Sequence, residues 1–118
     1  MAYLAGCPPG ALIEILVRLE LNQLELPPSY LLLRISAPDR MSISDLLLPE
    51  GEAWKEDEVV TRKVGDAWLK SRRSALARVP SAILPDTFNY LLNPLHPDAA
   101  RVTIAKVHNA LLDERLLR

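Results

Sequence analysis

Apolar residues near the start of the chain recur every three or four positions, which is the spacing of one face of a helix. They are Leu12, Ile13, Leu16, Val17 and Leu19. Pro8-Pro9 stands just before them, and proline suits a first helical turn because its missing N–H has no intrahelical partner there. Pro27-Pro28 then favours an extended backbone. The pattern predicts a helix over residues 9–22, ended by the second proline pair.

Four further segments have strand-like patterns. The run Tyr30–Ile35 is apolar at almost every position, which is typical of a central strand buried on both faces. Met41–Ile43 alternates as a short strand, after which Ser44 is suited to begin a brief helical turn. Val102–Val107 alternates as a longer strand, and Asp113–Leu116 has the pattern of a final short one.

A second helix is predicted in the middle of the chain. Residues 49–60 are acidic and include a proline and a glycine, so we interpret them as a surface loop. Thr61 suits the N-cap position that follows, and the helix extends to about Ser71. Val64 and Trp68 are four residues apart, so they lie on one face of this helix.

The segment from Leu76 to Leu84 has strand character but is interrupted by Pro80, whose missing N–H requires an edge, a bulge or a bend. Such an interruption redirects the next side chain, which is Ser81. Asn93–Pro97 contains two prolines and predicts a fixed loop. Together the elements predict one α+β domain over residues 1–118, with mixed or antiparallel sheets of short strands and two main helices.

Composition narrows the class of protein. Hydrophobic residues make up 49% of the 118 residues, enough for one buried core. The net charge of −1 gives no general attraction to nucleic acid, and no apolar run is long enough to span a membrane. Cys7 is the single cysteine, so no internal disulfide can form. We interpret it as a structural thiol. We expect a cytoplasmic protein.

The charges are unevenly distributed along the chain. Residues 50–58 carry five acidic side chains and one lysine, whereas residues 62–78 carry six basic side chains and one aspartate. The pattern favours solvated helix faces and loops. A phosphate-rich ligand or an acidic partner surface is the alternative interpretation.

Candidate chemistry is sparse when the residues are taken singly. Glu14 interrupts an apolar helical turn; the pattern favours its solvent side, whereas a carboxylate beside the core requires a partner or a catalytic role. Tyr3 and Ser81 are equally ambiguous, as half-buried and turn residues respectively. His96 stands between two prolines, where bonding of its ring to the backbone is the simplest interpretation. The two histidines and the cysteine lack metal-ligand spacing, so we expect no metal site.

A series of short motifs nevertheless resembles the RES domain family. Gly65-Asp66-Ala67-Trp68-Leu69, then Val79-Pro80-Ser81, then Asn89 to Pro97 and finally Asp113 to Leu116 follow the family's order. The opening Ala2-Tyr3-Leu4-Ala5 and Ala11-Leu12-Ile13-Glu14 are similar to a further segment of the family, which precedes these motifs. Each motif is short, but their order and spacing make the signal specific over nearly the whole chain.

The resemblance implies functional positions. It gives catalytic roles to Glu14 and Ser81 and substrate binding to Tyr3, Asn93 and His96. We expect Glu14 and Ser81 to face each other across one nucleotide-sized hollow. The family's arginine lies upstream of the tyrosine, so we expect the chain to lack that N-terminal segment.

The resemblance also implies a fold similar to ADP-ribosyltransferase toxins and a toxin that consumes NAD. In that view NAD is the substrate, no cofactor is needed, and the nicotinamide–ribose bond is broken by hydrolysis, phosphorolysis or ADP-ribose transfer. The expected partners are a neutralising Xre-like antitoxin and a second copy of the chain, without direct contact to nucleic acid or membrane. The alternative is a catalytically impaired remnant that acts only in antitoxin binding or dimerisation.

Overall fold

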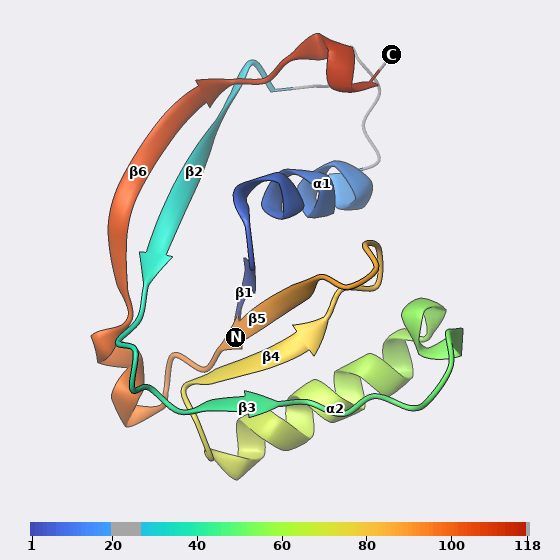
Figure 1. Ribbon diagram of the computed structural model, residues 1–118, viewed down its shortest axis with the longest axis vertical. Helices are drawn as coiled ribbons and strands as arrows, with labels where there is room; N and C mark the ends of the chain where they lie inside the picture. Colours follow the sequence, from blue (N-terminus) through green and yellow to red (C-terminus); the bar gives the residue numbers. More distant parts are fainter. Residues whose placement is uncertain (20–26, 118) are drawn as a thin grey trace.

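The protein has the α+β architecture that the sequence predicts, with two α-helices and two sheets (Figure 1). The computed structural model describes residues 1–19 and 27–117. In chain order, the elements are β1 (Ala2–Ala5), α1 (Pro8–Leu19), β2 (Ser29–Ser36), β3 (Ile43–Asp45), the 3-10 helix η1 (Ala53–Glu56), α2 (Glu58–Ser71), β4 (Leu76–Pro80), β5 (Phe88–Leu92), η2 (Pro97–Arg101), β6 (Thr103–Leu111) and η3 (Glu114–Leu117).

The main sheet has four strands in the order β1-β5-β4-β3. β5 is antiparallel to both of its neighbours, and β3 pairs with β4 in parallel. The register sets Ala5 opposite Asn89 and Pro80 opposite Phe88. The ends of β1 and β4 and the start of β5 therefore meet at one end of the sheet, and this end carries the candidate site.

Helix α2 covers one face of the main sheet. Its Trp68 is 1% exposed and packs with Leu46, Ala77 and Leu91. The indole Nε1–H donates to the Ser74 hydroxyl at 3.1 Å, so the polar edge of the ring is satisfied inside the core. A second apolar cluster forms around Met41, Ala75 and Leu76, with Leu4 and Leu92 packed against it.

The remaining two strands, β2 and β6, form a separate antiparallel sheet, which we call the ribbon. Figure 1 shows it as a long arm that curves away from the main sheet. The prediction that Tyr30–Ile35 forms a buried central strand is therefore wrong, because Leu31 is 64% and Leu33 45% exposed in β2. An apolar run shows that a strand has apolar side chains on both faces, but it does not show whether other elements cover those faces.

Helix boundaries differ from prediction at α2. Its N-cap is Asp57, whose carboxylate accepts from the backbone N–H of Val59 and of Val60 at 3.1 and 3.3 Å. Thr61 lies inside the helix, so the predicted N-cap is wrong, because a stronger capping residue stands four positions earlier. Within the predicted helix 9–22, the start at the proline pair is confirmed, and residues 20–22 lie outside the described residues.

Two short predicted elements are also corrected. Ser44 lies within β3 and not in a helical turn, and its hydroxyl bonds that of Ser74 at 2.6 Å. Asp113–Leu116 is not a strand, because the Leu116 backbone N–H donates to the Asp113 carbonyl at 3.1 Å and closes a 3-10 turn. The Asp113 carboxylate also accepts from the Arg115 backbone N–H at 2.9 Å.

Three other expectations agree more closely with the fold. The loop at residues 93–97 is confirmed as irregular up to the start of η2, and the predicted strand at 102–107 falls largely within β6. The 76–84 strand stops at Pro80. Within residues 1–19 and 27–117, neither helix has the length and apolar character needed to cross a lipid bilayer.

Candidate active site

Four polar side chains from two distant parts of the chain meet where β1, β4 and β5 converge. The Glu14 Oε1 atom accepts from the Ser81 hydroxyl at 3.1 Å and from the Asn89 side-chain amide at 2.9 Å. The same Asn89 nitrogen donates to the Tyr3 hydroxyl at 3.2 Å. We call these residues the Glu14 cluster. Three of its members, Tyr3, Glu14 and Ser81, are positions that the family resemblance selected.

A close backbone approach brings α1 to the sheet. Gly6 separates β1 from α1, and a Cβ atom built on it would lie 2.7 Å from the Phe88 carbonyl oxygen. Glycine is therefore the residue that lets the chain pass over the start of β5 at this distance. Helix α1 begins two residues later, at Pro8, and this path brings the Glu14 carboxylate within hydrogen-bond distance of the Asn89 side chain.

The Ser81 hydroxyl has no hydrogen-bonding capacity left over. Its oxygen accepts from the backbone N–H groups of Ile83 and Leu84, both at 3.1 Å, while its proton goes to Glu14. A serine hydroxyl has one donor and two acceptor positions, so all three are occupied. Its backbone N–H also closes the β4–β5 turn by donating to the Thr87 carbonyl at 2.8 Å. In this arrangement Ser81 holds the glutamate and is itself held by the turn.

The position of Glu14 differs from what the helix pattern favoured. The pattern alone favoured the solvent side, but the side chain is half-buried against the sheet, while Ile15 and Val17 are 52% and 51% exposed. The Oε1 atom is therefore held from two sides, by the Ser81 hydroxyl and by the Asn89 amide.

A hollow of about 250 Å3 adjoins the cluster. Its wall includes Trp54, Lys55, Ser81, Leu84 and Phe88, so η1 forms one side and the β4–β5 turn the other. We call it the Ser81 hollow. Glu14 does not line it, so the expected arrangement is modified: the two catalytic candidates are in direct contact, and the hollow opens beside Ser81. Its volume lies just below the range of about 300–1,000 Å3 typical of small-molecule sites.

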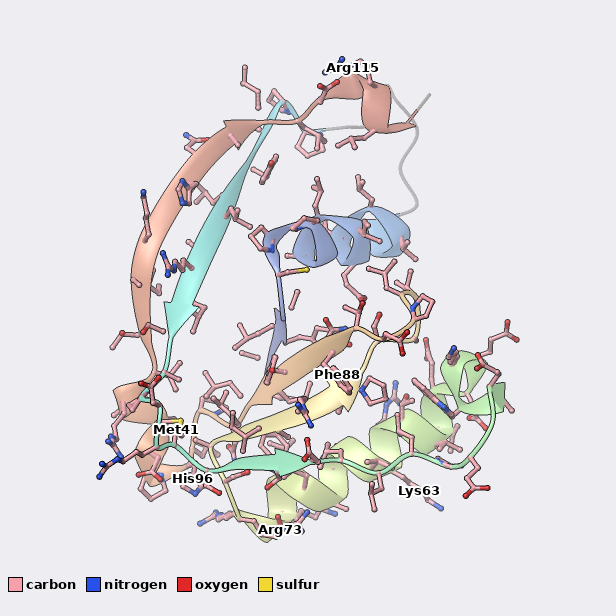
Figure 2. The ribbon with its side chains drawn as sticks, in the orientation of Figure 1. Met41, Lys63, Arg73, Phe88, His96 and Arg115 are labelled. Carbon is pink, nitrogen blue, oxygen red and sulfur yellow. The ribbon has the colours of Figure 1, made fainter. Side chains whose placement is uncertain are left out.

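Asn93 and His96 are not brought to the Glu14 cluster. Asn93 follows the far end of β5, where its side-chain oxygen accepts from the Leu95 backbone N–H at 3.1 Å. His96 caps η2 by accepting from the Asp98 backbone N–H at its Nδ1 atom, at 3.0 Å. Figure 2 shows His96 well separated from Phe88, which lies beside the hollow. Substrate binding by these two residues stays a prediction.

The basic residues that we considered for anion binding lie in different places. Arg72 ends α2, and Arg73 follows it, at the end of the main sheet opposite the Glu14 cluster. Closer to the cluster, the guanidinium of Arg78 lies 4.6 Å from the centre of the Phe88 ring. Arg78 Nε also donates to the Asp45 carboxylate at 2.7 Å.

Metal-ligand arrangement and one pKa shift can also be compared with the position of the cluster. Across the described ranges, no group of three or more histidine, cysteine or acidic side chains is arranged to hold a metal ion. Hydrogen bonding to the Arg115 side chain lowers the pKa of Asp113, but this exposed pair lies in the C-terminal turn. The cluster itself consists of a carboxylate held by a hydroxyl and an amide donor.

Sequence reasoning missed Asn89 as a member of the site. It lies in β5 with its neighbour Leu91 facing the same core, and it is only 1% exposed. A polar amide in an apolar strand is costly to bury without partners, so its presence in the run Phe88–Leu92 was a usable signal.

The fold is α+β, and the site joins Tyr3, Glu14 and Ser81. Both features agree with the motifs that resemble the RES domain. The RES domain model matches residues 1–113, and the chain belongs to the RES family. It is 41% identical over 117 residues to "Toxin Res" of Pseudomonas putida, covering 98% of this chain and 79% of that protein. It is 34% identical over 123 residues to the "Prs ADP-ribosylating toxin" of a Sphingobium strain, covering 100% of this chain and 75% of that protein.

Proposed function

We propose that this protein is a toxin that consumes NAD by breaking the bond between nicotinamide and ribose. The observation that carries the proposal is the direct contact of Glu14 with Ser81, which joins the two catalytic candidates across 67 positions of the chain. The names of the two relatives, a toxin and an ADP-ribosylating toxin, point in the same direction. NAD is the substrate, and no separate cofactor is part of the proposal.

The carboxylate suits this reaction for an electrostatic reason. When the C–N bond breaks, its electron pair leaves with nicotinamide and positive charge develops on the ribose, as in glycoside hydrolysis. Glu14 stabilises that charge more in the transition state than in the ground state, which is the condition for catalysis. Ser81 and Asn89 hold Oε1, and we assign the contact with the ribose to Oε2. Water, phosphate or a protein side chain then bonds the ribose carbon, and the proton that this acceptor loses passes to the solvent.

The Ser81 hollow supplies a place for the ring next to the breaking bond. Trp54 is half-buried in its wall, and Phe88 lies opposite on the β4–β5 side. An aromatic wall of this kind stacks on a flat ring with about 1–3 kcal/mol per base. A Trp54→Ala variant is expected to raise KM for NAD by about 10-fold while changing kcat little, because it removes binding common to ground and transition states. An unchanged KM would show that the ring binds elsewhere.

The decisive experiment follows nicotinamide release from NAD by chromatography. The protein is expected to release nicotinamide, and Glu14→Gln is expected to lower kcat by about 100-fold or more, because the charge is removed while the shape is kept. Glu58→Gln is the matched control, since Glu58 is an exposed glutamate in the first turn of α2. Equal rates for Glu14→Gln and Glu58→Gln, or no release by the wild-type protein, would contradict the proposal.

The biological setting follows from the same proposal. We place the protein in the cytoplasm, where NAD is abundant and a lone cysteine stays reduced, and pair it with an Xre-like antitoxin that blocks the Glu14 cluster. Expression in bacterial cells is expected to lower cellular NAD and arrest growth, whereas Glu14→Gln cells grow normally. If cells that make Glu14→Gln stop growing as wild-type cells do, the toxicity does not depend on NAD cleavage, and the proposal is contradicted.

A second candidate function is self-association, which would remain even in a catalytically impaired remnant. The observation that favours it is the exposed apolar side of the ribbon, formed by Leu31, Leu33, Ile104, Val107 and Leu111. None of these side chains is charged, so a second copy is able to cover them with the identical surface in a two-fold dimer. Light scattering is expected to show a dimer, which Leu33→Glu converts to a monomer and Thr103→Glu does not. A wild-type monomer would eliminate this candidate.

A further inference from the structure

We propose that Asn89 is a positioning residue of the site, which holds the Glu14 carboxylate and the Tyr3 hydroxyl in a fixed relation through its two amide N–H groups. The inference rests on the proposed function for its catalytic meaning. Its structural content, that one buried amide orients the glutamate, is independent of the reaction.

The burial of Asn89 makes its hydrogen bonds consequential. The residue is 1% exposed, in the second position of the central strand β5, so water does not replace a lost partner. An amide is retained at such a position only where its polar atoms are satisfied.

The donor geometry fixes which way the amide faces. Nδ2 lies 2.9 Å from Glu14 Oε1 and 3.2 Å from the Tyr3 oxygen, and a planar NH2 group has two hydrogens that point in different directions. The reverse orientation would set the amide oxygen against the carboxylate, where both atoms are acceptors. Asn89 therefore donates to both groups at once, and the distance between tyrosine and glutamate is set by one rigid amide.

Asn89 and Ser81 hold Glu14 from two sides of the site. Ser81 is anchored by the β4–β5 turn, whereas Asn89 is anchored by the backbone pairing of β5 with β1 and β4. Two donors on Oε1 restrict rotation of the carboxylate, so that Oε2 keeps one direction. Preorganised donors of this kind act on the rate and not on the strength of substrate binding.

Two substitutions separate this role from a purely structural one. Asn89→Leu keeps the number and branching of the side-chain heavy atoms and removes both donors, so kcat is expected to fall by about 10- to 100-fold with KM changed less than about threefold. Asn89→Asp places a second carboxylate beside Glu14. As the pH falls from about 8 to about 5, the two acids come to share a proton and an O–H donor returns. Activity of Asn89→Asp relative to wild type is therefore expected to rise toward acid pH.

Ser74→Ala is the control for lost buried hydrogen bonding. Ser74 is 2% exposed and bonds Trp68 and the Leu76 carbonyl, away from the Glu14 cluster. Its removal is expected to lower the midpoint of urea unfolding while the pH profile and kcat of the folded protein stay as in wild type. An Asn89→Asp profile that is parallel to wild type, or an Asn89→Leu enzyme with full kcat, would overturn the positioning role.

A double-mutant cycle on unfolding tests the contact without any activity measurement. The unfolding constants of Glu14→Ala, Asn89→Leu and the double variant are compared in urea. If the two residues are coupled, the unfolding constant of the double variant rises by less than the product of the two single-variant increases. Effects that multiply within about twofold would overturn the inference. If the wild-type protein leaves NAD intact, the proposed function fails, and this cycle alone still decides whether Asn89 orients Glu14.

Discussion

Replacing Ser81 by alanine tests the assignment of its hydroxyl as the link between the β4–β5 turn and the Glu14 cluster. The change removes one hydrogen bond to a carboxylate, for which about 1.5–3 kcal/mol is usual. It also removes the acceptor for the backbone N–H groups of Ile83 and Leu84, as in the loss of a helix cap, which costs about 0.5–2 kcal/mol. Because Ile83 is 38% exposed, water replaces part of that second contribution.

Together these effects predict a loss of about 2–4 kcal/mol in the free energy of unfolding, and a melting temperature lower by roughly 8–16 °C for a domain of this size. Urea and thermal unfolding measure both quantities. Ser42→Ala is the matched control, because Ser42 is exposed, and its replacement is expected to change stability by less than about 0.5 kcal/mol. Identical unfolding midpoints for the two variants would refute the assignment of Ser81 as a fully engaged hydroxyl.

Two further predictions concern the backbone approach and the C-terminal turn. Gly6→Ala is expected to destabilise the fold by about 1–3 kcal/mol and to lower activity, because its Cβ would lie 2.7 Å from the Phe88 carbonyl oxygen. Gly65→Ala is the control, because its Cβ would meet only a side chain, at 3.6 Å, and it is expected to be neutral or stabilising. Circular dichroism melting compares the two variants. Arg115→Gln is expected to raise the pKa of Asp113 toward its ordinary value, as followed by NMR titration. The sign follows from the lowered pKa in the folded state: the pair stabilises the fold above the ordinary pKa and stops doing so as the pH falls through the lowered one. A pKa of Asp113 that does not respond would contradict the role of the Arg115 side chain.

The two main helices could be predicted from the sequence because their signals are local. The four-residue spacing of Val64 and Trp68 predicted the buried face of α2, and Trp68 is indeed at the centre of the core. The proline pair before α1 located the start of that helix. Where two local signals competed, as Asp57 and Thr61 did for the N-cap, the choice required knowing which backbone N–H groups lacked partners.

Features that depend on contacts between residues far apart in the chain were harder to predict from the sequence. The exposure of Leu31 in β2 depends on which elements cover the ribbon, and no pattern within residues 30–35 reports that. The family motifs selected Glu14 and Ser81, but the hydrogen bond between them follows from the pairing of β4 with β5 and the path through Gly6. Asn89 was overlooked because its significance lies in two partners 75 and 86 positions away.

The central place of β5 in the main sheet has a consequence for the newly made protein. Glu14 leaves the ribosome many seconds before Asn89 at usual rates of synthesis of about 5–20 residues per second. Until β5 inserts between β1 and β4, the glutamate has neither its amide nor the closed turn that orients Ser81. A nascent chain that ends before Asn89 therefore has no assembled Glu14 cluster, and the carboxylate gains its two donors only after β4 and β5 have been synthesised.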